Sequence, residues 1–289
     1  MGDRPLRRRL IKLGMTLIAP RRAHRQDVWP HLGIDRDTGA VTWRGRRLLR
    51  LSGFADIVPR DLPLIAIVGS GPSLASQKPE RLPDRSAILL NGAATLADRL
   101  APLAVMVEDE RFVFRHMAML TALPRDLPLM LSPAALRAVA ERDAALLTGR
   151  PVALIDNLAK PVNAARRSLT DPALDHIVVR HGDAALSTDP DRGVVIHGTV
   201  ALTALQVALH ARPRQVVLAG IDLSNAAAPR FYETGDSRAP SGIVAGLDRI
   251  TAGFDAANRL ATAQETELLC ASPVSALLSL GIPRTEMLS

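Results

Sequence analysis

The chain has 289 residues, of which 47% are hydrophobic and 3% aromatic. This length and composition exclude a disordered chain and allow one large domain, or one domain with an appendage. The formal net charge of +7 is carried by residues 1–50, which hold 13 Lys and Arg against 4 Asp, while the rest is nearly neutral. A basic arm on a near-neutral domain favours an anionic surface as partner and argues against a nucleic-acid partner.

The cysteine content and the absence of a long apolar run bear on location. The single cysteine, Cys270, excludes an intramolecular disulfide and is typical of a reducing cytoplasm. No apolar run reaches the ~18–20 residues of a membrane span. Arg21 and Arg22 stand where a signal-peptide cleavage site needs small residues. We therefore predict a cytoplasmic protein.

Residues 1–60 are predicted to form a separate basic arm and joining segment. A helix is expected first, because Leu6, Leu10, Leu13 and Leu17 recur on one helical face, with Arg7–Arg9 and Lys12 on the rest. Two interpretations are open. In the first, residues 4–25 lie on an anionic membrane surface, peripheral on the inner face of the membrane. In the second, the helix packs on its own domain and its basic face is solvated. Residues 27–60 suggest a small β-hairpin or an irregular joining segment.

Residues 61–289 are predicted to form an α/β domain. Expected strands are 64–68, 86–90, 103–107, 127–131, 152–155, 176–180, 193–196, 215–220 and 266–270. Expected helices lie near 93–100, 110–122, 133–146, 159–169, 199–211, 247–264 and 274–280. Short apolar strands alternating with helices indicate a doubly wound, mostly parallel, Rossmann-like α/β sheet.

The most informative turn, Gly69-Ser70-Gly71-Pro72-Ser73, follows the strand at 64–68. In such folds, ligands bind beyond the carboxyl ends of the strands, where free backbone N–H groups attract phosphate. The spacing matches neither a Walker A loop nor the dinucleotide fingerprint. A tight strand-to-helix turn also needs glycine for structural reasons, so both interpretations are open.

Other strand ends carry further candidates. Asn91 offers an amide to a base or a sugar, or is a turn residue. Glu108 and Asp109 suit a metal ligand, a sugar contact or a general base, or are acids at a helix N-terminus. His197 is a base, a ribose ligand or a packed histidine.

Two more candidates lie near the end of the strand at 215–220. Asp222 follows Gly220, where packing explains a carboxylate poorly. Arg230 and Tyr232 lie in a long stretch, 224–246, that we interpret as a lid, because loops of that length are usually functional or disordered. Together these two side chains suit phosphate oxygens.

Several short motifs, in this order, resemble those of the bacterial sialyltransferases of glycosyltransferase family 42 and the related MptE-like domains. The motifs are Gly69–Leu74, Leu90-Asn91, His197-Gly198-Thr199, Val217–Asp222 and Leu269–Pro273. The MptE-like group includes pterin diphosphokinases and flagellin-glycosylation factors. The resemblance spans roughly residues 64–283, and its most specific parts are the Gly-Pro-Ser-Leu loop and the Gly-Ile-Asp strand end.

The resemblance implies that residues 61–289 are one nucleotide-sugar-binding domain, a GT-A-like variant of the fold. It also implies that this domain uses a CMP-activated sugar and inverts the anomeric carbon without a metal. It implies that the Gly-Pro-Ser loop and Asn91 contact the CMP phosphate and sugar, Thr199 the cytidine, and Tyr232 the departing phosphate. The predicted donor-binding residues are Gly69, Ser70, Gly71, Pro72, Ser73, Asn91, Gly198, Thr199, Gly220, Asp222, Arg230, Tyr232 and Ser272.

This chain departs from the family pattern at three points. Ser70 stands where the family usually has asparagine. The family uses two lid tyrosines, whereas this chain has only Tyr232. The family's catalytic histidine lies in the lid, but no histidine follows His210 in this chain. By location alone, the catalytic base falls to His197 or Asp109.

The predicted activity is transfer of sialic acid or another ulosonic acid from a CMP donor to a glycan or lipid-linked acceptor. No metal or further cofactor is expected. One alternative is an MptE-like pyrophosphokinase with magnesium on Glu108, Asp109 and Asp222. The other is a noncatalytic nucleotide-binding domain.

Overall fold

A computed structural model describes residues 4–223, 230–232 and 246–289. Its centre is a seven-stranded parallel sheet in the order β12-β11-β4-β5-β6-β7-β8. The strands are β4 (Leu64–Val68), β5 (Ala87–Leu90), β6 (Ala104–Val107), β7 (Leu129–Leu131), β8 (Val152–Leu154), β11 (Gln215–Ala219) and β12 (Glu267–Cys270). The strand order reverses between β4 and β11, which confirms the doubly wound, Rossmann-like α/β fold.

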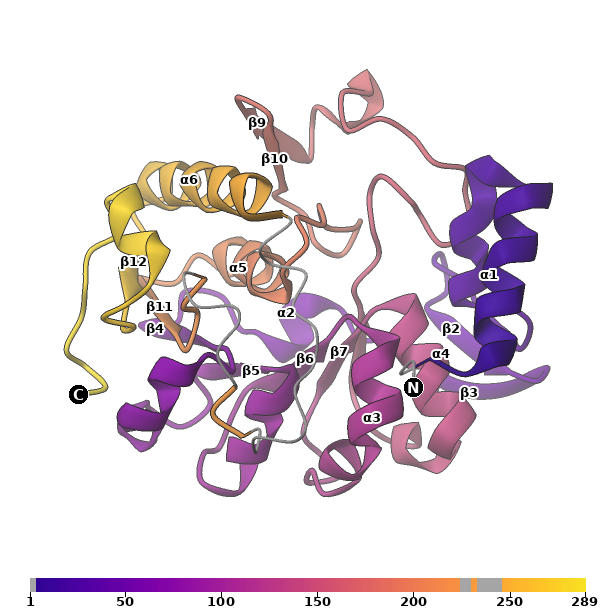
Figure 1. The fold of residues 1–289 in the computed structure, drawn as a ribbon, viewed down its shortest axis with the longest axis horizontal. Helices are drawn as coiled ribbons and strands as arrows, with labels where there is room; N and C mark the ends of the chain where they lie inside the picture. Colours follow the sequence, from indigo (N-terminus) through magenta and orange to yellow (C-terminus); the bar gives the residue numbers. More distant parts are fainter. Residues whose placement is uncertain (1–3, 224–229, 233–245) are drawn as a thin grey trace.

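Helices cover both faces of this sheet, as Figure 1 shows. On one face lie α5 (Val200–His210) and α6 (Leu247–Ala263), and on the other lie α3 (Glu110–Thr121), α4 (Pro133–Asp143) and the 3-10 helix η4 (Asn91–Asp98). Shorter helices are α2 (Phe54–Ile57), η2 (Pro72–Ser76), η3 (Pro79–Arg81), η5 (Ala144–Leu147), η6 (Pro172–Leu174) and η8 (Ala276–Leu280).

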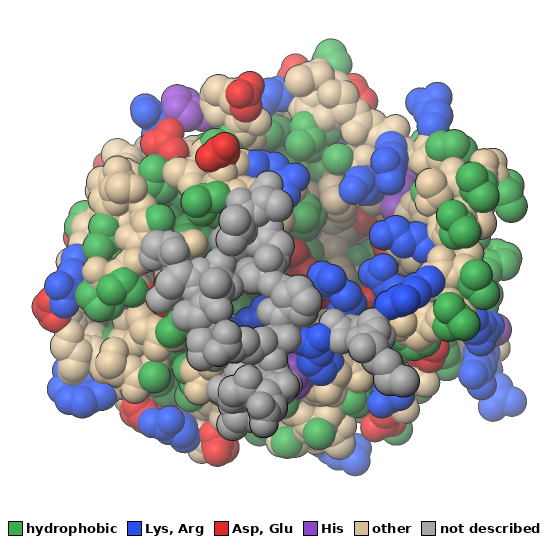
Figure 2. Space-filling view, viewed as in Figure 1, with side chains coloured by type: hydrophobic (Ala, Val, Ile, Leu, Met, Phe, Trp, Pro, Cys, Tyr) green, Lys and Arg blue, Asp and Glu red, His purple; other side chains and the backbone are tan. Residues whose placement is uncertain are grey.

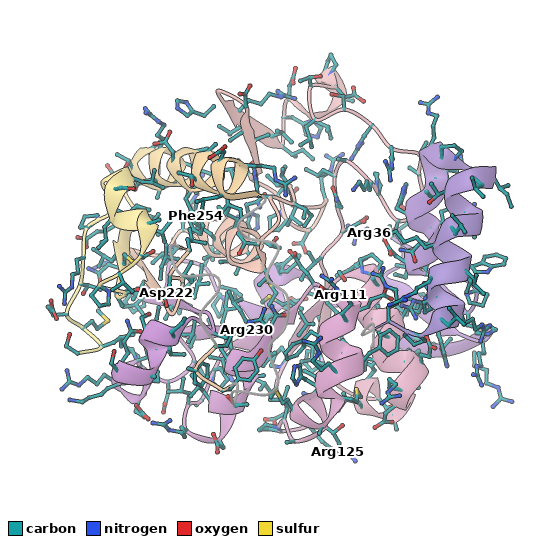
Figure 3. All side chains as sticks on the ribbon, in the orientation of Figure 1. Arg36, Arg111, Arg125, Asp222, Arg230 and Phe254 are labelled. Atoms are coloured by element: carbon teal, nitrogen blue, oxygen red, sulfur yellow. The ribbon has the colours of Figure 1, made fainter. Side chains whose placement is uncertain are left out.

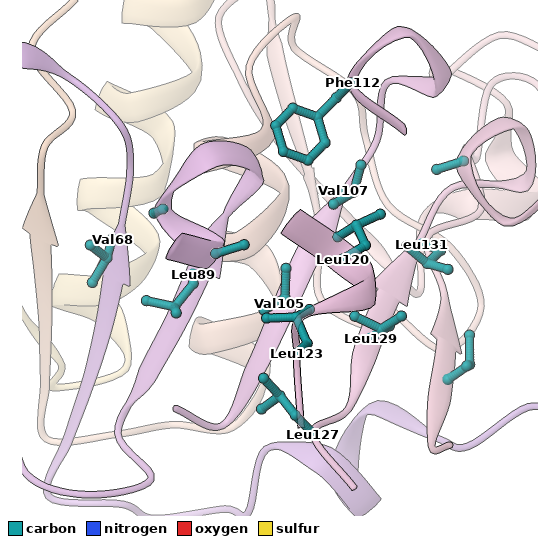
Figure 4. Packing of buried hydrophobic residues seen from close by; sticks show 14 of the residues in the cluster. Val68, Leu89, Val105, Val107, Phe112, Leu120, Leu123, Leu127, Leu129 and Leu131 are labelled. Carbon is teal, nitrogen blue, oxygen red and sulfur yellow. The ribbon is translucent and has the colours of Figure 1, made fainter. Parts of the chain in front are cut away.

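Both faces of each central strand are apolar because each face has its own core. In β4, Ile65 and Ile67 pack with α5 and α6, whereas Ala66 and Val68 belong to the core with α3 and α4. Figure 4 shows this second core, in which Phe112 of α3 lies over side chains of the sheet. The continuous apolar runs of the sequence follow from this double burial.

The N-terminal part is ordered around a second, smaller sheet. It holds α1 (Leu6–Ile18), the 3-10 helix η1 (Pro20–Asp27) and three antiparallel strands, β1 (Leu32–Ile34), β2 (Ala40–Trp43) and β3 (Arg46–Arg50). Leu32, Val41 and Leu49 of these strands share the core of α3 and α4. Of the two interpretations of residues 27–60, the hairpin is therefore the one observed. The domain boundary at residue 60 stays a prediction.

Two predicted elements between residues 159 and 196 are wrong, and a third, a strand, is present but pairs differently. Residues 159–169 form no helix, because their backbone is held by the N-terminal part: His24 Nε2 bonds the carbonyls of Pro161 and Ala164 at 2.8 and 3.0 Å. The run at 193–196 forms a single bridge at Val194 instead of a strand. The strand at 176–180 is half of an antiparallel hairpin outside the main sheet, β9 (Val178–His181) with β10 (Ala184–Ser187).

Candidate functional site

The glycine-rich turn after β4 lies against the turn after β11, at the point where the strand order reverses. Gly69 N donates to Ala219 O at 2.8 Å, and Gly71 N donates to Gly220 O at 2.7 Å. A Cβ atom on Gly69 or Gly71 would lie 2.5 or 2.7 Å from Gly220 O. Gly220 itself has a φ of +59°. The glycines are thus required for the close approach of these two turns.

The Asp222 carboxylate joins the ends of three strands. Its Oδ2 accepts a hydrogen bond from Ser73 N at 2.9 Å, and its Oδ1 accepts from Ser73 Oγ and Ser272 Oγ, each at 2.5 Å. Asp222 is 4% exposed and Ser272 is fully buried. Ser73, Asp222 and Ser272 therefore come together, and Asp222 positions the loop that carries Ser73.

Asn91 begins η4 at the end of β5, with a left-handed φ of 48°. Its Oδ1 is buried and has no hydrogen-bond partner among the described residues. A buried amide oxygen without a partner is costly, which makes this atom a candidate ligand contact.

The ring of Tyr232 lies over Gly92, the residue after Asn91. A Cβ atom added to Gly92 would lie 1.8 Å from Tyr232 Cε1. Arg230 Nη1 donates to Tyr232 Oη at 3.1 Å, and the tyrosine ring meets His116 edge-on, with ring centroids 5.9 Å apart. In Figure 3, Arg230 lies between Asp222 and Arg111 across the molecule. Arg230 and Tyr232 thus come together beside the end of β5, while the rest of the predicted lid, 224–229 and 233–245, lies outside the described residues.

A cavity of about 330 Å³ opens at the carboxyl ends of β6, β7 and β8. Its lining is mostly polar and charged: Arg4, Asp27, Glu108, Asp109, Glu110, Ser132, Pro133, Ala134, Ile155, Asp156, Asn157, Lys160 and Ile196. Glu108, Ser132 and Asp156 each follow a strand of the main sheet, which is the signal by which the sequence could have identified this cavity.

Besides Asp27, whose pKa burial raises to about 6, the cavity holds Glu108 as a group suited to proton transfer. Its Oε1 is buried and has no hydrogen-bond partner among the described residues. Burial raises the pKa of Glu108 to about 7, an effect that the Asp109 carboxylate reinforces and the Thr203 hydroxyl opposes. A carboxyl group with a pKa near neutrality is suited to general acid–base chemistry. Its own carbonyl accepts from Ser132 Oγ at 2.5 Å, which fixes the loop.

Asp109 has a different role from its neighbour. It is the N-cap of α3 and accepts from Arg111 N at 2.8 Å, while its other oxygen accepts from Arg111 Nε at 2.8 Å. These contacts are those of a helix cap, and they engage both carboxylate oxygens. Of the two acids that were left open, the geometry favours Glu108 over Asp109 as a base.

His197 lies inside the fold, 4% exposed. Its Nε2 is 2.7 Å from Ala185 O, and a Cβ on Gly253 of α6 would lie 3.0 Å from its Nδ1. Burial lowers the pKa of His197, so the imidazole is neutral near pH 7. Both ring nitrogens face protein, which matches the interpretation of a packed histidine.

Gly198 and Thr199 form the start of α5. Gly198 has a φ of +92°, and a Cβ there would lie 2.5 Å from Arg249 Nη2. Thr199 is the N-cap, and its Oγ1 accepts from Ala201 N at 3.4 Å. Because α5 leads back to the amino end of β11, its N-terminus lies at the carboxyl edge of the sheet, where Thr203 neighbours Glu108.

Ser73, Asn91 and Glu108 follow three adjacent strands, β4, β5 and β6. With parallel strands about 4.8 Å apart, they span roughly 10 Å of one sheet edge. Asp222 follows β11, which lies three strand positions from β6, the strand that Glu108 follows. Among the described residues, no group of His, Cys, Asp and Glu side chains is arranged to hold a metal ion.

No protein-family model matches the chain, and no curated protein matches it. Among solved structures, the sialyltransferase CstII from Campylobacter jejuni, in complex with the substrate analogue CMP-3FNeuAc, resembles it with a TM-score of 0.42 and 13% sequence identity. The alignment covers 79% of this chain and 88% of that chain. An identity and a TM-score at this level assign neither a family nor an activity.

Proposed function

We propose that the chain is a glycosyltransferase that takes a CMP-linked ulosonic acid as donor and passes the sugar to a glycan or lipid-linked acceptor. One observation carries the proposal: Ser73, Asn91 and Glu108 lie in a row along the edge of β4, β5 and β6. A glycine-rich turn follows the first of these strands, and the third ends at a cavity that holds a carboxyl group with a pKa of about 7. The choice of CMP follows from the ordered motifs, from Gly69–Leu74 to Leu269–Pro273.

In this proposal the donor phosphate lies against the Gly69–Ser73 turn, at the strand-order reversal. The buried Asn91 Oδ1 accepts a hydrogen bond from the sugar or the ribose. Arg230 and Tyr232, 3.1 Å apart at their polar ends, hold the phosphate oxygens as the donor breaks. Thr199, at the start of α5, faces the nucleoside.

Glu108 is proposed as the general base. Its carboxylate removes the proton of the acceptor hydroxyl while that oxygen bonds the anomeric carbon. The bond from the anomeric carbon to the phosphate oxygen breaks, and CMP leaves with the electron pair. A single displacement of this kind inverts the anomeric carbon. A base with a pKa near the working pH is half ionised there and still accepts a proton efficiently.

The acceptor enters through the 330 Å³ cavity, whose lining includes Lys160 and, from the N-terminal part, Arg4. This arrangement puts donor and acceptor on opposite sides of Glu108.

The test is a transfer assay with a panel of CMP-linked ulosonic acids, comparing Glu108→Gln with Asp109→Asn. We expect loss of Glu108 to lower kcat by about 10²–10⁴-fold, the usual contribution of a general base, and loss of Asp109 to have little effect. Equal activity of the two variants would contradict the assignment of the base. Tight CMP binding without turnover of any donor would instead select a noncatalytic binding domain.

The pyrophosphokinase alternative needs Glu108, Asp109 and Asp222 around one magnesium ion. Asp222 follows β11, three strand positions from β6, and accepts hydrogen bonds from Ser73 and Ser272. Among the described residues, no group of acidic, His or Cys side chains is arranged to hold a metal ion. The three acids therefore do not form one ligand set. Thermal stabilisation by ATP with magnesium, but not by CMP, would support this alternative over ours.

A further inference from the structure

Helix α1 packs on the protein through its polar face and leaves its apolar face to solvent. Leu6, Leu10, Leu13 and Leu17 form the stripe, and they are 70, 61, 58 and 74% exposed. Ile18, at the end of the helix, is 86% exposed. These residues supply five of the eight large hydrophobic side chains that are exposed in the described part of the chain.

The inner face of α1 is fixed by arginines. Arg8 is 2% exposed, and its Nη1 donates to Trp29 O at 2.6 Å. Both Arg8 and Arg4 face the carboxylate of Glu110, which is 1% exposed. The orientation of the helix is therefore set by a buried ion-pair network, and the leucine stripe points away from it.

The flanks of the stripe are strongly basic. Residues 4–26 contain eight Lys and Arg and no Asp or Glu. Six of these cations are exposed: Arg7, Arg9, Lys12, Arg21, Arg22 and Arg25. On a helical wheel, Arg7 and Arg9 fall on either side of the stripe. Figure 2 shows hydrophobic side chains along the outer edge of the molecule over α1, with Lys and Arg side chains next to them.

We propose that this stripe, with its basic flanks, docks on a lipid bilayer that carries anionic headgroups. An apolar face between cations is the chemistry of a helix lying in a membrane interface: the leucines enter the acyl boundary and the cations pair with headgroups. A second copy of the chain is a poorer occupant, because residues 4–26 offer no acid and would bring cation against cation. In this proposal α1 lies on the surface of the bilayer. Among the described residues, no helix has the length and hydrophobicity of a membrane span.

Vesicle co-sedimentation of the full-length chain tests the proposal independently of any enzymatic activity. The vesicles are phosphatidylcholine alone and phosphatidylcholine with about 30% phosphatidylglycerol, the kind of anionic surface to which basic segments bind. The variant Leu10→Glu/Leu13→Glu removes the centre of the stripe while keeping good helix formers. The matched control is Val179→Glu, since Val179 on β9 is 45% exposed and lies outside α1.

We expect the wild type and Val179→Glu to sediment with anionic vesicles, and the double leucine variant to bind about 10²-fold more weakly. Arg7→Gln/Arg9→Gln should weaken binding to anionic vesicles alone, because it removes only the headgroup contact. Circular dichroism melts confirm that each variant is folded.

The proposal is overturned if the wild type stays in the supernatant with anionic vesicles, or if the double leucine variant binds them like the wild type. It is also overturned if light scattering finds a dimer that Leu10→Glu/Leu13→Glu dissociates and no vesicle binding, because the occupant is then a second copy.

Discussion

Asp222 receives both the main-chain N–H and the hydroxyl of Ser73, at 2.9 and 2.5 Å, so one buried carboxylate sets the shape of the glycine-rich loop. The same carboxylate accepts from Ser272. The Asp222 side chain thus holds three loops at the carboxyl edge of the sheet. The sequence motif alone predicts a ligand contact at this position.

Replacing Asp222 with alanine leaves the Ser73 N–H and the Ser272 hydroxyl without their acceptor. Because each unpaired buried group costs about 1–3 kcal/mol, we expect the free energy of unfolding to fall by about 2–6 kcal/mol. Denaturant unfolding measures it. Asp255→Ala is the control, since its carboxylate is 37% exposed and pairs with Arg259 on the surface. Surface pairs contribute about 1 kcal/mol or less, so equal losses in the two variants would contradict the role of Asp222.

Glu108 makes stability depend on pH in a particular direction. Its pKa is about 7 in the folded chain against an ordinary value of 4.5, so between these values its proton favours the folded state. That contribution disappears as the pH rises through 7. Glu108→Gln lacks it, so the melting temperature of the variant minus that of the wild type should increase from about pH 5 to about pH 8. Asp109→Asn serves as control, and a difference for Glu108→Gln that stays flat across this range argues against the raised pKa.

Gly92 makes room for the ring of Tyr232, the single tyrosine of the chain. Gly92→Ala should displace that ring and weaken CMP binding by about tenfold, the equivalent of one lost aromatic contact. Tyr232→Ala should have a similar effect. The control is Gly14→Ala on α1, where a Cβ would meet nothing within 4 Å. Calorimetric titration with CMP checks the prediction, and unchanged affinity in Gly92→Ala would remove Tyr232 from the site.

Glu110 holds α1 in place. Glu110→Gln leaves Arg4, Arg8 and Arg137 without the buried carboxylate that they share, and breaking such a network costs about 3–5 kcal/mol. We expect faster trypsin cleavage at Arg7 and Arg9 as well as lower stability. Glu141→Gln, at the 34% exposed partner of Arg137, is the milder control. If both variants resist trypsin like the wild type, α1 is held by other contacts.

The sequence predicted the sheet well because its strands are buried on both faces, as in β4, where Ile65 and Ala66 enter different cores. It failed at 159–169, where the carbonyls of Pro161 and Ala164 bond His24, a residue more than 130 positions away, and no helix forms. No local pattern carries that information.

The sequence predicted where the candidate site lies, but not which role each side chain has in it. Asp109 caps α3, whereas the pKa of Glu108 depends partly on Thr203, which α5 brings from far along the chain. The leucine periodicity predicted α1, but not that Arg8 and Glu110 would turn its apolar face outward.

The central claim is that the ends of β4, β5 and β6 hold a nucleotide-activated sugar, and a crystal structure of the chain with CMP tests it most directly. We predict the phosphate against the Gly69–Ser73 turn and a nucleotide hydroxyl on Asn91 Oδ1. CMP bound elsewhere on the molecule, or no bound CMP at saturating concentration, would contradict it.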